Sequence, residues 1–170
     1  FLWLDRIPLS LLGMSLLVFA NDFVTMSLAT DNVKQTSNPN SWEVKKIVLA
    51  SLVPGLFLVV EGLLVIVMGM RYFHLEWEQM RTLVMLNLIF NSQFRVLIVR
   101  ERRHFWSSRP GLELTLLSAA TILVFSLLGI FGVMVPALSG EHVLAVLLFS
   151  ALFTLAIDVP KYYVFKKCGI

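Results

Sequence analysis

The sequence predicts an all-α fold, an integral membrane bundle of five transmembrane helices. Hydrophobic residues make up 58% of the 170 residues and charged residues only 15%, with a mean hydropathy of +0.82. A soluble domain with a water-facing surface does not sustain such a composition. The apolar residues also gather into five runs, and about 20 residues suffice for a helix to cross roughly 30 Å of hydrocarbon. The bilayer is therefore the expected solvent.

The five runs define the expected helices and leave little chain for a soluble catalytic domain. They cover residues 8–29, 47–70, 82–99, 112–135 and 142–159. Pro8 suits the first turn of a helix, and Pro160 is expected to end the last one. Turn or charge signals separate the runs. Residues 1–170 are accordingly predicted to form one transmembrane domain.

Basic residues predict the orientation, because positively charged loops are retained on the cytoplasmic side. Most of them follow the first, third and fifth runs: Lys34, Lys45, Lys46, Arg100, Arg102, Arg103, Arg109, Lys161, Lys166 and Lys167. Only Arg6, Arg71 and Arg81 belong to the opposite side. The N-terminus is therefore predicted to be external and the C-terminus cytoplasmic. Five crossings with an external start imply a preceding span, so we interpret the chain as a fragment.

Several function classes are disfavoured. The net charge of +3 fits anionic lipid headgroups better than nucleic acid, because the basic residues form short clusters between apolar runs. The single cysteine, Cys168, allows no internal disulfide and no thiolate cluster for a soft metal. The sequence has no phosphate-binding glycine loop, HExxH, CxxC or nucleophile elbow. We expect no catalytic residue and no metal site within this chain.

Asp22 is the principal candidate for transport. A charge near the bilayer centre costs at least about 2.5 to 3.5 kcal/mol, so ionisable residues there are functional candidates. Ser15, Asn21 and Thr25 fall on the same side of the first predicted helix as Asp22, given about 100° per residue. A desolvated carboxylate can hold a proton and release it when a cation or water approaches. A structural hydrogen-bonded acid is the alternative.

Glu61, Asn87, Asn91 and Arg95 form a second group of candidates. The last three are spaced by four residues and give the third run a polar stripe, which is either a hydrogen-bonded helix contact or one wall of an ion path. Glu61 and Arg95 are candidates for a structural ion pair. Their expected depths differ, however, with Glu61 at mid-membrane and Arg95 about one turn from the cytoplasmic end. We therefore expect no direct pair.

Two further features concern helix packing. Asp158, with Thr154 one turn earlier and Lys161 three residues later, is expected to have a structural role at the membrane edge. In the second run, Gly55, Gly62 and Gly69 recur every seven residues. They indicate either a face for close helix contact or the general enrichment of glycine in membrane helices.

Three segments carry a family resemblance. LVFANDFVTMSLATDNVKQTSNPNSW, from Leu17 to Trp42, resembles the sixth membrane helix and following loop of plasma-membrane proton-pumping P-type ATPases. NSQFRVLIVRERRHFWSSRPG, from Asn91 to Gly111, is similar to the end of their eighth helix, and DVPKYYVFKK to the end of their tenth. The matching features of the first segment are Asn21-Asp22, Thr25-Met26, Asp31, Val33-Lys34, Pro39 and Trp42.

The resemblance implies that the five runs are the sixth to tenth helices of such a pump. Asp22 then corresponds to the carboxylate that accepts and releases the transported proton, Asn21 to its preceding amide, and Thr25 to the neighbouring polar residue. Phe23 and Gln35 stand where plant and fungal pumps commonly have Gly and Pro, so prokaryotic pumps are the better comparison.

The same resemblance implies partners that this chain does not contain. These are the lipid bilayer of the cell membrane, membrane helices one to five, and cytoplasmic domains that use ATP and Mg²⁺. The fragment alone would not hydrolyse ATP. The alternatives are a calcium- or magnesium-transporting P-type ATPase, a standalone channel or secondary transporter, and a structural membrane subunit. A pump requires Asp-Lys-Thr-Gly and Gly-Asp-Gly motifs upstream of Phe1.

Overall fold

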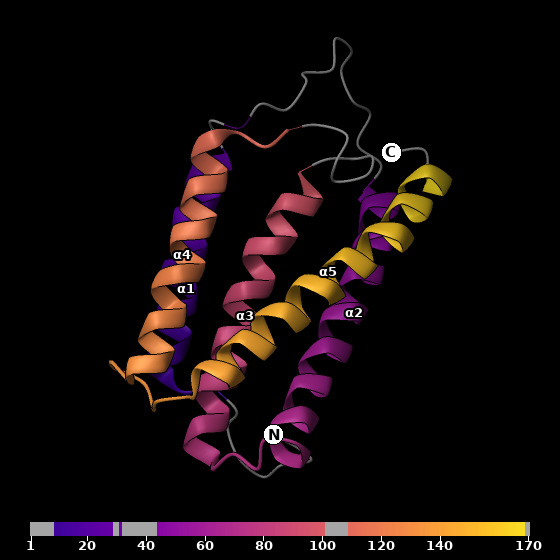
Figure 1. The fold of residues 1–170 in the computed structure, drawn as a ribbon. Helices are drawn as coiled ribbons and strands as arrows, with labels where there is room; N and C mark the ends of the chain where they lie inside the picture. The colour runs from indigo at the N-terminus through magenta and orange to yellow at the C-terminus, as the bar shows by residue number, and fades with distance from the viewer. Residues whose placement is uncertain (1–8, 29–30, 32–43, 101–108, 169–170) are drawn as a thin grey trace.

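The computed structural model is an all-helical bundle (Figure 1). It describes residues 9–28, 31, 44–100 and 109–168, and no strand occurs among them. The helices are α1 (Leu11–Ser27), α2 (Val44–Arg71), α3 (Trp77–Val99), α4 (Leu112–Phe131) and α5 (Gly140–Cys168). Successive helices run in alternate directions (Figure 1). The predicted fold class is confirmed.

Local capping sets the helix starts. Ser10 caps α1 by accepting a hydrogen bond from the backbone N–H of Gly13 at 3.0 Å. The predicted start at Pro8 lies outside the described residues. α3 begins at Trp77, five residues before the expected 82, because Glu76 and Gln79 form a reciprocal capping box. The capping box extends the helix beyond the apolar run that hydropathy detects.

The ends of α4 and α5 correct two predicted boundaries. α4 stops at Phe131 rather than at 135, because Gly132 adopts a left-handed conformation with φ of 67° and its N–H bonds to the carbonyl of Leu128. α5 continues through Pro160 to Cys168, so the expected stop at 159 is wrong. Lys161, directly after the proline, is buried against α3 and donates to the carbonyl of Ile98 at 2.8 Å. This contact holds the part of α5 that follows the proline against the last turn of α3.

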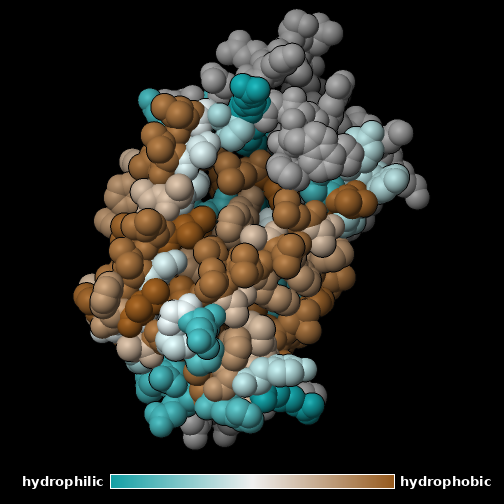
Figure 2. Space-filling view, viewed as in Figure 1, coloured by the Kyte–Doolittle hydropathy of each residue, from teal (hydrophilic) through white to brown (hydrophobic). Residues whose placement is uncertain are grey.

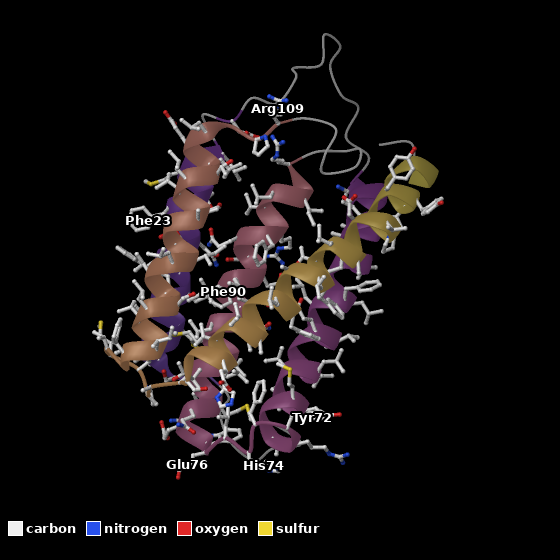
Figure 3. All side chains as sticks on the ribbon, viewed as in Figure 1. Phe23, Tyr72, His74, Glu76, Phe90 and Arg109 are labelled. Atoms are coloured by element: carbon white, nitrogen blue, oxygen red, sulfur yellow. The ribbon has the colours of Figure 1, made fainter. Side chains whose placement is uncertain are left out.

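α3 is the central element of the bundle. It packs against α1, α2, α4 and α5, and α5 crosses it diagonally (Figure 1). Most of its side chains are buried, including Leu83, Leu86, Ile89 and Phe90 at 0% exposure. Phe90 lies in the middle of the bundle (Figure 3). The other four helices thus each have a face directed away from the core.

Those outward faces are apolar. Exposed leucine, valine and phenylalanine side chains cover α1, α2, α4 and α5, and hydrophilic residues gather at the two ends (Figure 2). Arg109 lies at one end, and Tyr72, His74 and Glu76 lie at the other (Figure 3). An apolar belt between polar ends suits a surface that faces lipid tails.

Among the described residues, two helices are long and apolar enough to cross a membrane. These are α4, with a hydropathy of 2.3, and the Gly140–Val164 part of α5, with 2.2. Leu11–Met26 of α1 is apolar but shorter. α2 and α3 have 28 and 23 residues, and at about 1.5 Å per residue both are long enough for a crossing. Composition supports membrane association most directly at α4 and α5.

The cytoplasmic ends expected for α1, α3 and α4 are joined by a buried ion pair. Arg100 and Asp31 are each 1% exposed, with their side-chain nitrogen and oxygen 2.9 Å apart. The other oxygen of Asp31 accepts from the backbone N–H of Gly111 at 2.7 Å, immediately before α4. The contact fixes three chain segments that are far apart in sequence.

The glycine spacing in α2 corresponds to a helix contact at only one position. Gly69 packs tightly against the side chains of Met80 and Leu83 on α3. A Cβ atom at Gly55 or Gly62 would meet nothing within 4 Å. The prediction of a glycine face for close helix contact is therefore confirmed at Gly69 only. Gly55 and Gly62 make no such contact among the described residues.

The left-handed conformation of Gly132 generates the first prediction. We expect Gly132→Ala to lower the free energy of unfolding by about 1–2 kcal/mol, since an L-residue is strained in that conformation. Its Cβ would also lie 2.9 Å from the Cβ of Ala137. The matched control, Gly55→Ala on the open face of α2, should stabilise by about 0.5–1 kcal/mol. Chemical unfolding in detergent would measure both, and equal effects would contradict the assignment.

Candidate functional site

Asp22 lies on the outer face of α1. Its side chain is exposed and lines an open groove with Met14, Ser15, Val18 and Phe19. The carboxylate therefore borders the apolar belt without another acid beside it in this groove. In hydrocarbon an ionised group at this position would be costly, so protein or water has to cover it.

The polar neighbours predicted for Asp22 are present but do not bind its carboxylate. Asn21 is half-buried and Thr25 is exposed. The Thr25 hydroxyl donates to the backbone carbonyl of Asn21 at 2.8 Å, and the Ser15 hydroxyl donates to that of Leu11 at 3.1 Å. Ser15 and Asp22 share the groove as expected, while the hydroxyl protons of Ser15 and Thr25 are used within α1.

Phe23 lies next to Asp22 on the exterior of the helix. It is 44% exposed, and its ring packs edge-on against that of Phe19, with centroids 4.8 Å apart. Figure 3 shows Phe23 at the outer side of the α1–α4 pair. The aromatic pair makes one side of the Asp22 helix bulky and apolar.

Glu61 lies inside the bundle, between α2, α3 and α5. It is 0% exposed, and its Oε2 atom accepts a hydrogen bond from the side-chain amide of Asn91. Its other oxygen, Oε1, has no hydrogen-bond partner among the described residues. One turn below Asn91, the side-chain oxygen of Asn87 accepts from the hydroxyl of Ser150 at 2.8 Å. We call Glu61, Asn87, Asn91 and Ser150 the Glu61 cluster.

Two members of the predicted polar stripe, Asn87 and Asn91, form hydrogen bonds between helices, whereas no such bond is found for Arg95 among the described residues. Asn91 joins α3 to α2, and Asn87 joins α3 to α5. Hydrogen bonds between membrane helices are typically worth about 1 kcal/mol each, because the polar groups also find partners when the helices are separated in the membrane. The alternative role of the stripe, as a wall of an ion path, stays a prediction.

Ser150 is the member that sequence reasoning missed. It is 0% exposed and lies beside the Glu61 carboxyl group as well as Asn87. The available signal was its spacing from Thr154: both are buried, four residues apart, in an otherwise apolar helix. This is the same spacing that drew attention to Asn87 and Asn91.

As the sequence predicted, Arg95 does not form an ion pair with Glu61. No nitrogen of Arg95 lies within 4.0 Å of a carboxylate among the described residues, and the side chain is only half-buried. It does lie within electrostatic range of Glu61. Arg95 therefore provides a positive field at the edge of the Glu61 cluster without a direct contact.

Asp158 takes the structural role that was expected for it. Its carboxylate lies 3.0 Å from the amine of Lys161, and both side chains are nearly fully buried. Since Lys161 also donates to the carbonyl of Ile98, the pair joins α5 to the last turn of α3. Thr154, one turn earlier, donates to the backbone of its own helix and does not join the pair.

The two acidic positions are chemically different. Asp22 is open to the surroundings, whereas Glu61 is enclosed, and α3 packs against both α1 and α2 between them. Among the described residues no three His, Cys, Asp or Glu side chains come together in a group that could hold a metal ion. The arrangement therefore offers two separate carboxyl groups in different surroundings, one in an open groove and one enclosed by neighbouring helices.

Comparison with known proteins finds a distant similarity to a larger protein. No family model matches the sequence. A protein from Methanocaldococcus jannaschii that carries the provisional name cation-transporting ATPase is 23% identical over 164 residues. The alignment covers 96% of this chain and 20% of that relative, so the chain spans about a fifth of its length. The chain is thus distantly similar to a cation-transporting ATPase over nearly its whole length.

The hydrogen bonds of Glu61 generate the second prediction. In a double-mutant cycle, Glu61→Ala and Asn91→Ala should show a coupling above about 1 kcal/mol in the free energy of unfolding, because their side chains are in contact. The matched pair Glu61→Ala and Arg95→Ala should be closer to additive, since no direct bond joins them. Unfolding in detergent would measure both cycles. A larger coupling with Arg95 would establish the ion pair instead.

Proposed function

We propose that this chain is the membrane part of an ATP-driven cation pump and that the exported ion is the proton. The observation that carries the proposal is the similarity to a cation-transporting ATPase over 96% of the chain. The all-helical bundle with its apolar outer faces supports the membrane location. ATP hydrolysis and Mg²⁺ binding would belong to domains outside this chain.

Asp22 is the proposed proton carrier, with Asn21 and Thr25 as its polar neighbours. Its exposed position on α1 supports this role, because a carrier has to be reached by water or by the moving ion. The groove supplies one carboxylate, whereas calcium takes about six to eight oxygen ligands. One carboxylate suffices to bind a proton, so a proton fits the groove better than calcium or magnesium.

The exposed face of α1 also suggests a contact surface for other helices of the pump. A carboxylate facing lipid tails would be unfavourable, and an adjacent protein helix could provide hydrogen bonds or a water-filled path. We propose that the remaining membrane helices of the pump pack against the groove of Met14, Ser15, Val18, Phe19 and Asp22. ATP-driven changes in that contact would alternate access to Asp22 between the two sides of the cell membrane.

Substitution of Asp22 tests the carrier role. In the full-length pump, Asp22→Asn should abolish or severely slow ATP-driven proton flux, because the amide keeps the shape but cannot exchange a proton. Glu113→Gln makes the same chemical change at the exposed start of α4 and should leave the flux intact. Acidification of sealed vesicles would measure both. Near-normal pumping by purified Asp22→Asn protein would remove Asp22 from the mechanism.

The proposed orientation can be tested by labelling. Single cysteines introduced near Lys45 and near Glu78, in a Cys168→Ser background, lie at opposite ends of the bundle. We expect a membrane-impermeant thiol reagent to reach only the position near Glu78 from outside intact cells. Labelling from outside at the position near Lys45, and not at the position near Glu78, would contradict the proposed orientation.

The upstream reading frame discriminates between a pump and a standalone channel or secondary transporter. A pump requires the Asp-Lys-Thr-Gly segment that is phosphorylated and the Gly-Asp-Gly segment, both before Phe1. A complete gene without these segments would contradict the proposed ATP-driven function.

A further inference from the structure

The Glu61 cluster contains an acid whose burial requires an explanation. Glu61 is 0% exposed in the middle of α2, and the side chains around it come from α3 and α5. An ionised carboxylate away from water is strongly unfavourable unless a charged partner and hydrogen-bond donors stabilise it. Without them, the group takes up a proton.

Hydrogen-bond donors are scarce around Glu61. Asn91 supplies one N–H to Oε2. The Ser150 hydroxyl is a second hydrogen-bond partner beside the Glu61 carboxyl group, but its single proton is shared with Asn87, to which it donates at 2.8 Å. Oε1 is therefore left without a donor among the described residues, although it is buried. A carboxylate with one amide donor and a hydroxyl that it shares with Asn87 has fewer than the two or three full hydrogen bonds that stabilise an ionised acid.

Charged partners are equally scarce. On α3, Arg95 acts on Glu61 only through its field and makes no ion pair with it. On α5, Asp158 and Lys161 are paired with each other at 3.0 Å. On α2, Glu61 is the only charged residue between Lys46 and Arg71. Among the described side chains of these helices, no cation forms an ion pair with the Glu61 carboxylate.

We propose that the Glu61 cluster is a second proton-binding site, in which Oε1 of Glu61 holds one proton. The proton comes from water, forms an O–H bond on Oε1 and returns to water when the site opens, with no other bond made or broken. The bound O–H can donate to the hydroxyl oxygen of Ser150 beside the carboxyl group, so that Oε1 is no longer an unsatisfied acceptor. The site lies across α3 from Asp22.

A proton suits this cluster better than a metal cation. A metal ion would bring added positive charge close to Arg95 and would need several oxygen ligands, whereas Glu61 supplies the only carboxylate of the cluster. A proton neutralises the acid without a coordination shell. This inference goes beyond the proposed function, because it depends neither on Asp22 nor on ATP.

Infrared difference spectroscopy tests the proposal directly. The full-length protein in lipid vesicles should show the C=O stretching band of a protonated carboxylic acid, which appears and disappears reversibly as pH is cycled. Glu61→Gln should remove one carboxyl equivalent from this band, while Asp22→Asn should retain the Glu61 component. Failure of the band to change in Glu61→Gln would overturn the proposal. Because the readout is not transport, the proposed pump function can fail independently.

A second variant tests the proposal if Glu61→Gln fails to fold. Ser150→Ala leaves Glu61 and Asn91 in place but removes the hydroxyl beside the carboxyl group, so it should shift the frequency of the Glu61 band without removing it. An unmoved band would overturn the assignment to this cluster. Addition of sodium at constant pH should leave the band unchanged. Loss of the band on sodium addition would show that a metal cation occupies the site and would also overturn the proposal.

Discussion

The bundle depends on one constraint: the polar groups of its central helix have to be satisfied by neighbouring helices, since lipid tails offer no hydrogen bonds. α3 packs against all four other helices and carries Asn87 and Asn91 in buried positions. Asn87 and Asn91 bind side chains of α5 and α2. A helix with this composition would be unfavourable at a lipid-facing position, so its polarity directs it to the centre.

The same constraint gives the acidic residues different environments. Glu61 reaches inward from α2 to the polar side of α3, where contacts are tight and charge partners are distant. Asp22 projects from α1 away from α3 into an open groove. An enclosed carboxyl group interacts with the side chains packed around it, whereas a carboxyl group in an open groove interacts with whatever covers that groove. Glu61 and Asp22 therefore have chemically different surroundings within one bundle.

Buried ion pairs at the expected cytoplasmic end tie the helices together. Arg100 and Asp31 connect the end of α3 to the residues that follow α1, and Lys161 with Asp158 connects α5 to the last turn of α3. Such pairs add less to stability than their geometry suggests, because both charges lose hydration. Their main effect is geometric.

The sequence predicted five helices, their order and the all-α class, because hydropathy records which segments leave water. It also predicted that Asp158 would be structural and that Glu61 and Arg95 would not pair. Helix boundaries were less predictable. The start of α3 depends on a capping box outside the apolar run, and the continuation of α5 past Pro160 accompanies the Lys161 contact with α3. The hydropathy of a segment does not predict either interaction.

For the candidate site, the sequence by itself determined which residues were ionisable or polar within apolar helices. Helical periodicity placed Ser15 and Asp22 on one side and Asn87, Asn91 and Arg95 on another. Only the tertiary structure decided that Asp22 faces outward, that Glu61 faces inward and that Ser150 completes its surroundings. Periodicity fixes the relative angle of side chains on one helix. It does not fix the rotation of that helix about its axis, which depends on packing against residues distant in sequence.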